Sequence, residues 1–174
     1  MTVVYLKYVL ILLCFVLGGV LHAQLGLSQA WYLYVGGVVL LLFQLLMGNV
    51  WTTYSHLKRG RPILAERMLN QVWNPKLLIR RNRAYYYFCK GLIALQQKDM
   101  EHAAEQLQLA LDTGMEHPND SALACLNLAH IHFVQRDWEQ AEVWMQKARS
   151  FPLNDLMIKE KLKELEQAIA ARKN

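Results

Sequence analysis

Two long apolar runs near the N-terminus constrain the fold of this chain more than any other feature. The first occupies residues 3–21 and is interrupted only by Lys7, and the second occupies residues 30–47 and is interrupted only by Gln44. A helix needs about 20 apolar residues to cross the hydrocarbon core of a bilayer. We therefore predict a transmembrane hairpin in which the two spans lie at about residues 3–21 and 30–50.

The segment between the runs, HAQLGLSQ, is short enough to be a turn, so both ends of the hairpin face the same side of the membrane. Lys58, Arg59 and Arg61 closely follow the second run, and Lys7 can snorkel to the same face. Because basic residues favour the cytoplasmic side, we place the rest of the chain in the cytoplasm. We interpret the protein as one of the bacterial inner membrane.

An alternative is that residues 1–23 are a cleaved signal peptide, although Leu21 is larger than the residue expected two positions before the cut. Two glycine pairs, at residues 18–19 and 36–37, lie at comparable distances from the turn. They let two membrane helices approach closely, or they are ordinary membrane glycines.

Positive charge is concentrated in one band rather than spread over the chain, whose formal net charge is +5. Eight basic residues lie between Lys58 and Arg83, against the single acid Glu66, whereas the sequence from Ala84 onward is slightly acidic. This distribution argues against nucleic acid as a partner. It favours a segment beside anionic lipid headgroups, and the residues predicted to lie there are Lys58, Arg59, Arg61, Arg80, Arg81 and Arg83. The alternative is a topology signal on a solvated helix face.

A pattern of small and apolar residues recurs every 38 residues. Ala65, Ala103 and Ala141 are each followed four residues later by Leu69, Leu107 or Met145, and seven residues later by Val72, Ala110 or Ala148. This spacing marks one face of a helix. Twelve residues before each alanine stands a small residue on the preceding helix: Thr53, Gly91 or Ala129. The pattern predicts antiparallel helix pairs that pack closely.

Over residues 84–150 this pattern resembles the tetratricopeptide repeat, a helix–turn–helix unit of 34 residues. The resemblance rests on Gly91, Ala103 and Ala110 in one repeat, and on Asn127-Leu128-Ala129, Asp137-Trp138, Ala141 and Ala148 in the next. The resemblance implies a short right-handed solenoid, and together with the two apolar runs it predicts an all-α fold in which a transmembrane hairpin over residues 1–50 precedes that solenoid. Residues 51–83 form a basic juxtamembrane segment and a degenerate first repeat, 84–150 two repeats, and 153–172 a capping helix.

Two further expectations concern the ends of the solenoid. No proline and only one glycine lie in GNVWTTYSHLK, which predicts a nearly continuous helix from about Trp31 to Arg59, with a flexible joint at Gly48-Asn49 as the alternative. At the other end, Asn154 or Asp155 caps the final helix. That helix carries an apolar stripe, as the cap of a solenoid requires: Leu156, Ile158, Leu162, Leu165 and Ile169. Asn119 or Asp120 is expected to cap the helix that ends near Gln135.

Nothing in the sequence indicates an active site, so we predict that the protein is not an enzyme and has no catalytic residues. A phosphate loop, a nucleophile elbow and a metal-binding histidine pair are all missing from the sequence. His130 and His132 are two residues apart, which places them on different sides of a helix. We therefore predict no cofactor and no metal.

The tetratricopeptide resemblance implies a groove lined by the first helix of each repeat. By position the groove residues are Tyr85, Phe88, Cys89, Leu92, Gln96, Leu123, Leu126, Asn127, His130 and Phe133. Asn127 matches an asparagine that often binds the backbone or carboxylate of a ligand peptide in this family. The alternative is that the aromatic residues belong to the core.

These features together predict a membrane-anchored adaptor or scaffold, which recruits or assembles a protein or peptide partner at the cytoplasmic face of the membrane. The alternative is a structural accessory subunit of a membrane complex that is bound mainly through its transmembrane hairpin.

Overall fold

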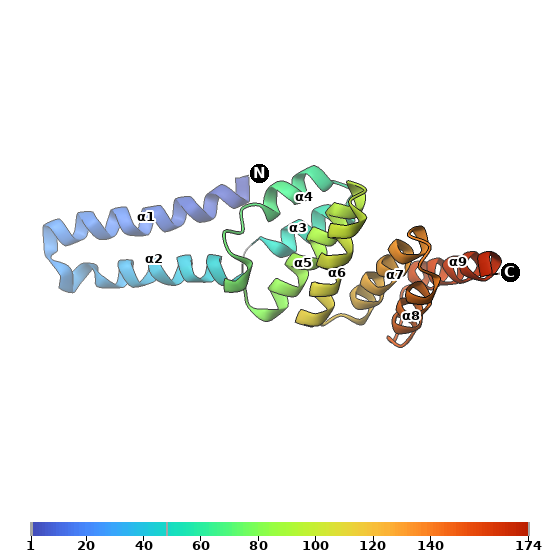
Figure 1. The fold of residues 1–174 in the computed structure, drawn as a ribbon. Coiled ribbons are helices and arrows are strands. Elements are labelled where there is room, and N and C mark those ends of the chain that lie inside the picture. The colour runs from blue at the N-terminus through green and yellow to red at the C-terminus, as the bar shows by residue number, and fades with distance from the viewer. Residues whose placement is uncertain (1, 48, 174) are drawn as a thin grey trace. The chain divides into compact units, whose positions relative to one another are not determined.

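The structure, a computed structural model, describes residues 2–47 and 49–173, and every regular element in these ranges is helical (Figure 1). The chain divides into two compact units, residues 1–48 and residues 49–174. The α-helices of the first are α1 (Thr2–Leu25) and α2 (Leu27–Met47). Those of the second are α3 (Val50–Lys58), α4 (Pro62–Leu69), α5 (Arg80–Gln96), α6 (Met100–Thr113), α7 (Pro118–Val134), α8 (Trp138–Arg149) and α9 (Leu156–Lys173), with a short 3₁₀ helix, η1 (Pro75–Leu77), before α5.

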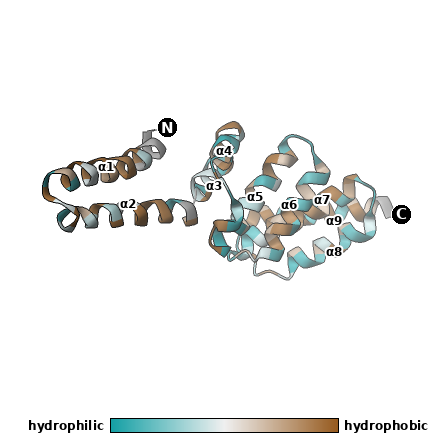
Figure 2. Cartoon of the chain, turned by 60° about the vertical axis from the view of Figure 1, so that its left-hand side comes forward, coloured by the Kyte–Doolittle hydropathy of each residue, from teal (hydrophilic) through white to brown (hydrophobic). Residues whose placement is uncertain are grey.

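The first unit is the predicted antiparallel pair of apolar helices. Each is long and apolar enough to cross a membrane, over Tyr8–Leu25 and Leu27–Gln44. Their colouring in Figure 2 is mostly hydrophobic, whereas hydrophilic residues are frequent in the second unit. The expected eight-residue turn is wrong in length: the two helices are separated by Gly26 alone, which has φ of 82°. Glycine adopts this left-handed conformation at no steric cost.

One glycine of each pair lies at the contact between α1 and α2. A Cβ atom on Gly37 would lie 2.9 Å from Cε2 of Phe15, and one on Gly18 would lie 3.3 Å from Cε1 of Tyr34. These two glycines therefore make room for an aromatic ring on the opposite helix. A Cβ on Gly19 or Gly36 would meet nothing within 4 Å, so those two glycines are not needed for this packing.

Three helical hairpins, α3–α4, α5–α6 and α7–α8, form most of the second unit, and they turn through the same backbone geometry. Gly60, Lys98 and Arg136 lie 38 residues apart and have φ of 67°, 63° and 64°. After each, an N–H donates to the carbonyl five residues back: Arg61 to His56 (2.9 Å), Asp99 to Ala94 (3.0 Å) and Asp137 to His132 (2.9 Å). This bond and the left-handed residue together make a Schellman ending. The repeat predicted from side chains is therefore also present in the backbone.

The small residues of the sequence pattern lie inside the hairpins. Thr53 and Ala129 on the first helices are fully buried, as are Ala65, Ala103 and Ala141 on the second helices. In the middle hairpin a Cβ atom on Gly91 would lie 2.7 Å from Cγ of Leu107. Only glycine fits at this position, because Leu107 is itself buried and its backbone N–H is also close.

Helix α9 covers the last hairpin. Ile158, Leu162, Leu165 and Ile169 are buried against α7 and α8, as the apolar stripe predicts. Leu156 is the exception: it is 69% exposed, because it is the first residue of the helix and precedes the packed turns. The side chain of Asp155 accepts a hydrogen bond from the Met157 N–H (2.9 Å), so the predicted cap by Asp155 is confirmed.

Two predicted helix boundaries are wrong. Helix α7 begins at Pro118, whose fixed φ suits the first helical position, so Asn119 and Asp120 lie in its first turn and do not cap it. The continuous helix from Trp31 to Arg59 is also not observed. Helix α2 ends at Met47 and α3 begins at Val50, with Asn49 at φ of −104° and ψ of 24° between them. Gly48, half of the alternative joint, lies outside the described residues.

The repeated turn makes a prediction about stability. Lys98→Gly should raise the free energy of unfolding by about 1 kcal/mol, because it removes the steric cost of a left-handed L-residue. Gly60→Ala should lower it by a similar amount. Denaturant unfolding of the full chain in detergent measures both. Gln97→Gly is the matched control: its φ is −81°, so glycine there relieves nothing and should destabilise. A loss of stability in Lys98→Gly equal to that in Gln97→Gly would contradict this account.

Candidate partner-binding site

The structure does not bring the ten predicted groove residues onto one surface. Tyr85, Phe88 and Cys89 are each 0% exposed and belong to the hydrophobic core. Their rings and sulfur pack beneath α3, whose Tyr54 ring centre lies 5.5 Å from that of Tyr85 and 5.9 Å from that of Phe88. The prediction that these three line an open groove is therefore wrong, because the degenerate first hairpin covers them. Leu92 is partly buried in the same core, and Gln96 is exposed at the end of α5.

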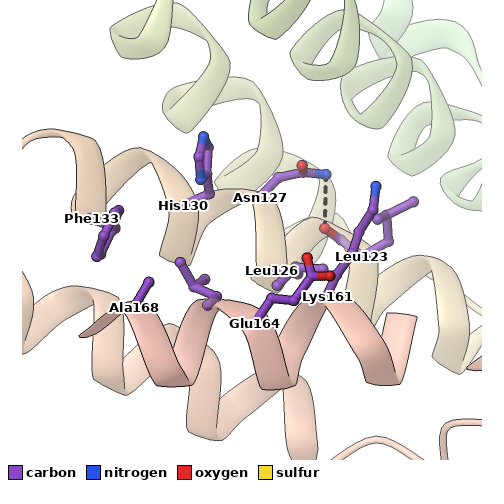
Figure 3. A pocket seen from close by; sticks show the side chains of 9 residues that line it. Leu123, Leu126, Asn127, His130, Phe133, Lys161, Glu164 and Ala168 are labelled. Carbon is purple, nitrogen blue, oxygen red and sulfur yellow. Dashed lines mark hydrogen bonds between the residues drawn. The ribbon is translucent and has the colours of Figure 1, made fainter. Parts of the chain in front are cut away.

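The other five predicted residues do come together. Leu123, Leu126, Asn127, His130 and Phe133 line a pocket of about 430 Å³. All five lie on α7, and the opposite wall is formed by α9 (Figure 3). The α9 side chains in this wall are Lys161, Glu164, Leu165 and Ala168. The capping helix is thus part of the site, which the sequence reasoning did not anticipate.

Asn127 has a fixed orientation at the edge of this pocket. Its Nδ2 donates to the carbonyl of Leu123, one turn earlier on the same helix, at 2.9 Å (Figure 3). A side-chain amide has two N–H groups and one acceptor oxygen. One N–H is used to hold the rotamer, which leaves Oδ1 and the second N–H to pair with the backbone of a ligand. The orientation therefore suits an extended peptide segment.

A second hollow, of about 600 Å³, adjoins the first, because Leu123 and Lys161 line both. Its other walls come from α3, from the N-terminus of α7 and from the start of α9, and they include Trp51, Tyr54, Lys58, His117 and Asp120. The Lys58 ammonium lies 4.5 Å from the centre of the Tyr54 ring. The two hollows together extend from α3 along α7 to α9 and combine apolar walls with two lysines, two histidines and the acidic residues Asp120, Asp155 and Glu164.

A buried carboxylate lies beneath the second hollow. Asp120 is 9% exposed, and its two oxygens accept hydrogen bonds from two buried tyrosines. The Tyr54 hydroxyl donates to Oδ1, and the Tyr85 hydroxyl donates to Oδ2 at 2.6 Å. Hydrogen bonds to a charged group typically contribute about 1.5–3 kcal/mol each. Since the three residues lie on α3, α5 and α7, this cluster joins the first helices of all three hairpins.

Aromatic rings surround the Asp120 cluster. The centre of the Trp51 ring lies 5.0 Å from that of Tyr85, and the His117 ring lies edge-on to both. The Arg81 guanidinium lies over the Trp51 ring, 4.9 Å from its centre, and its Nε is 3.0 Å from Glu116. These contacts fix the N-terminus of α7 against α3 and α5, and so they set the position of the α7 side chains that line the pocket.

Burial and the shared carboxylate both affect the titration of the tyrosines. Burial raises the pKa of Tyr54 and of Tyr85 well above the ordinary value, and donation to Asp120 raises the pKa further. Burial also raises the pKa of the Cys89 thiol, and that of Cys125 to about 11. These thiols therefore stay protonated and unreactive at neutral pH.

The predicted lipid-facing basic residues differ in their surroundings. Arg80 Nε donates to the carbonyl of Thr113 at 2.7 Å and so connects α5 to the end of α6, whereas Arg81 pairs with Glu116 and connects α5 to the loop before α7. Arg59 and Arg61 are exposed in the turn after α3, as is Lys58 at its end, and Arg83 is half-buried on α5. Contact of these residues with lipid headgroups stays a prediction.

The described residues contain no group of three or more His, Cys, Asp or Glu side chains placed to hold a metal ion.

The contact between Asp120 and Tyr54 is not predicted from the sequence. The available signal was the spacing of Asp120, Ala124 and Leu128, which places a carboxylate in line with the buried face of α7. Lys161 is not predicted as a site residue, because the apolar stripe of the final helix indicates only a packing role.

Comparison with protein-family models, with curated proteins and with solved structures found no match to this chain. The resemblance to the tetratricopeptide repeat therefore stays a prediction from the residues that carry it.

The buried tyrosines predict an alkaline loss of stability. An unfolded chain releases tyrosine protons near pH 10, whereas Tyr54 and Tyr85 keep theirs in the folded state. The unfolded state then binds fewer protons, so the free energy of unfolding falls as the pH rises above about 10. Tyr85→Phe should be less stable at neutral pH but should show a shallower decline between about pH 10 and 12. Thermal melts in detergent across this range measure the slope. Tyr87→Phe, outside the cluster, is the control, and equal slopes in both variants would contradict the assignment.

Proposed function

We propose that this protein is a membrane-anchored adaptor that recruits a protein or peptide partner to the membrane surface. The observation that carries the proposal is the pair of adjoining hollows along α7, which present apolar walls, an oriented amide and charged side chains to solvent. In this proposal the three hairpins form a short right-handed solenoid of tetratricopeptide type. Helix α9 then closes the solenoid and also supplies one wall of its binding groove.

The surface of the first unit supports its role as the anchor. Large apolar side chains point outward along both helices, including Leu12 (64% exposed), Val39 (57%) and Phe43 (59%). Such a surface is costly in water and favourable in lipid. The positive-inside rule, with Lys58, Arg59 and Arg61 after the second span, supports a cytoplasmic location for the second unit in a bacterial inner membrane.

Recruitment follows from confinement. A partner that binds the hollows along α7 is held at the bilayer, where its local concentration relative to other membrane proteins rises. The chemistry of the hollows favours an extended segment with apolar side chains. Leu123, Phe133 and Ala168 provide apolar contacts, while Asn127 and Lys161 pair with backbone or carboxylate groups.

A second candidate function is a structural accessory subunit bound mainly through α1 and α2. The observation that favours it is the open space beside Gly19 and Gly36, where another membrane helix can approach closely. Removal of residues 1–48, which leaves the second unit whole, separates the two functions. A soluble second unit that still binds its partner supports the adaptor, whereas loss of the partner with a folded second unit supports the accessory subunit.

A pull-down from detergent-solubilised membranes tests the binding site. Asn127→Ala and His130→Glu should each reduce recovery of the partner about tenfold, which corresponds to about 1.4 kcal/mol of binding free energy. Val143→Ala is the matched control, because Val143 is 51% exposed on α8 and lines neither hollow. Circular dichroism melts establish that each variant is folded. If recovery is the same for all three variants, the assignment of the hollows as the binding site is wrong.

A further inference from the structure

The segment between α4 and α5 presents apolar side chains to solvent in a fixed arrangement. Trp73 is 87% exposed, Leu77 is 44% exposed and Ile79 is 41% exposed. All three lie within seven residues of one another in the chain. Single exposed apolar residues are common on protein surfaces, but a cluster that includes a nearly fully exposed tryptophan marks an interaction surface.

This segment has a defined conformation, which hydrogen bonds and a buried side chain stabilise. The Asn74 side chain accepts a hydrogen bond from the Lys76 N–H at 2.9 Å, and Pro75 begins the single turn of η1. Leu78 is 3% exposed and anchors the turn in the core of the hairpins. With Leu78 directed inward, the neighbouring Leu77 and Ile79 remain at the surface. Leu77 and Ile79 are therefore held at the surface on either side of the buried Leu78.

The charge around this turn indicates what covers it. Lys76 lies between Trp73 and Leu77, and the band from Lys58 to Arg83 contains eight basic residues and one acid. Tryptophan with aliphatic and basic neighbours is the composition of segments that lie at the interface of a bilayer. Anionic headgroups complement the basic band, and the outer hydrocarbon accommodates the apolar side chains.

The membrane anchor of the same chain keeps this segment close to a bilayer. Only Gly48 separates the last residue of α2, Met47, from the first residue of the second unit, Asn49. Two backbone steps span at most about 7 Å. The second unit is therefore tethered at the membrane surface whenever α2 spans the membrane, and a short interfacial segment needs little intrinsic affinity to stay bound.

We propose that Trp73, Leu77 and Ile79, with Lys76 among them, insert into the headgroup layer of an anionic bilayer as a second membrane contact. This contact orients the second unit on the membrane, in addition to the tether. The inference rests on the membrane anchoring proposed above, and it is separate from the binding of a partner by α7 and α9.

Quenching of a fluorescent label by lipid tests the contact. The full chain, carrying Cys14→Ala, is labelled with bimane at Leu77→Cys and reconstituted into vesicles of phosphatidylcholine and phosphatidylglycerol. Some of the lipids carry a nitroxide, near the headgroup in one preparation and at the middle of the acyl chain in another, because Leu17 lies in the middle of its span. Cys89 and Cys125 are buried and escape labelling. Leu17→Cys on α1 is the positive control, and Val143→Cys on α8 is the negative control; both positions are about half exposed in the structure.

We expect the label at position 77 to be quenched, as at position 17, and the label at position 143 to stay bright. Adding Trp73→Ala or Lys76→Glu to the Leu77→Cys chain should reduce quenching toward the level at position 143. Both side chains are exposed, so these changes leave the fold intact. In vesicles of phosphatidylcholine alone, Lys76→Glu should have a smaller effect.

Two results would overturn the inference, and they are distinguishable. Quenching at position 17 with none at position 77 shows that the hairpin is embedded and that the segment is not, which leaves the surface to a protein partner. No quenching at position 17 refutes the membrane anchoring itself, and the second contact with it. Quenching at position 77 that is unchanged by Trp73→Ala and Lys76→Glu also contradicts the proposal, because these two side chains are then not its source.

Discussion

The hydrogen bonds from Tyr54 and Tyr85 to Asp120 are the interaction on which the second unit depends. A buried carboxylate is costly unless it is well hydrogen-bonded, and here each oxygen has a buried hydroxyl donor. The three residues come from α3, α5 and α7, so this one buried cluster joins the first helices of all three hairpins. It also fixes α7 at its first turn, and the side chains that line the candidate site project from the following turns of the same helix.

The repeated and the non-repeated residues of the second unit have different roles. The repeated features form the hairpins: a residue in the same left-handed conformation stands in each turn, at 60, 98 and 136, and small residues at the same register let the paired helices approach closely. The candidate sites are formed by residues that depart from the repeat. Asp120 and its tyrosines break the apolar pattern, α9 adds a wall to one hollow, and the segment that carries Trp73 lies between the first and second hairpins. The function we propose therefore rests on the residues that do not repeat.

Much of the fold could be predicted from the sequence because the helices and their pairing produce local periodic patterns of apolar and small residues. The 38-residue spacing of alanines identified the helix pairs, and the two apolar runs identified the first unit. Features that depend on how hairpins stack could not be predicted. Tyr85 and Phe88 have the spacing of groove residues, but α3 buries them. The contacts of Asp120 with Tyr85 and Tyr54 join residues 35 and 66 positions apart, and no local spacing in the sequence predicts such contacts. Conversely, Asn127 and His130 stay accessible beside α9, because no further hairpin follows α8. Leu126 is buried against α9, and the binding role of these residues stays a prediction.

Hydrogen exchange of the full chain, compared with that of Asp120→Ala, tests most directly the claim that one carboxylate holds the hairpins together around the site. Peptides from α3 and from the N-terminal half of α7 should exchange faster in the variant. Those from α9 should keep their protection, since α9 packs on a separate apolar cluster with α7 and α8. Asp120→Asn, which keeps one acceptor oxygen, should lie between the two. Unchanged exchange in α3, or an equal increase along the whole second unit, would contradict the claim.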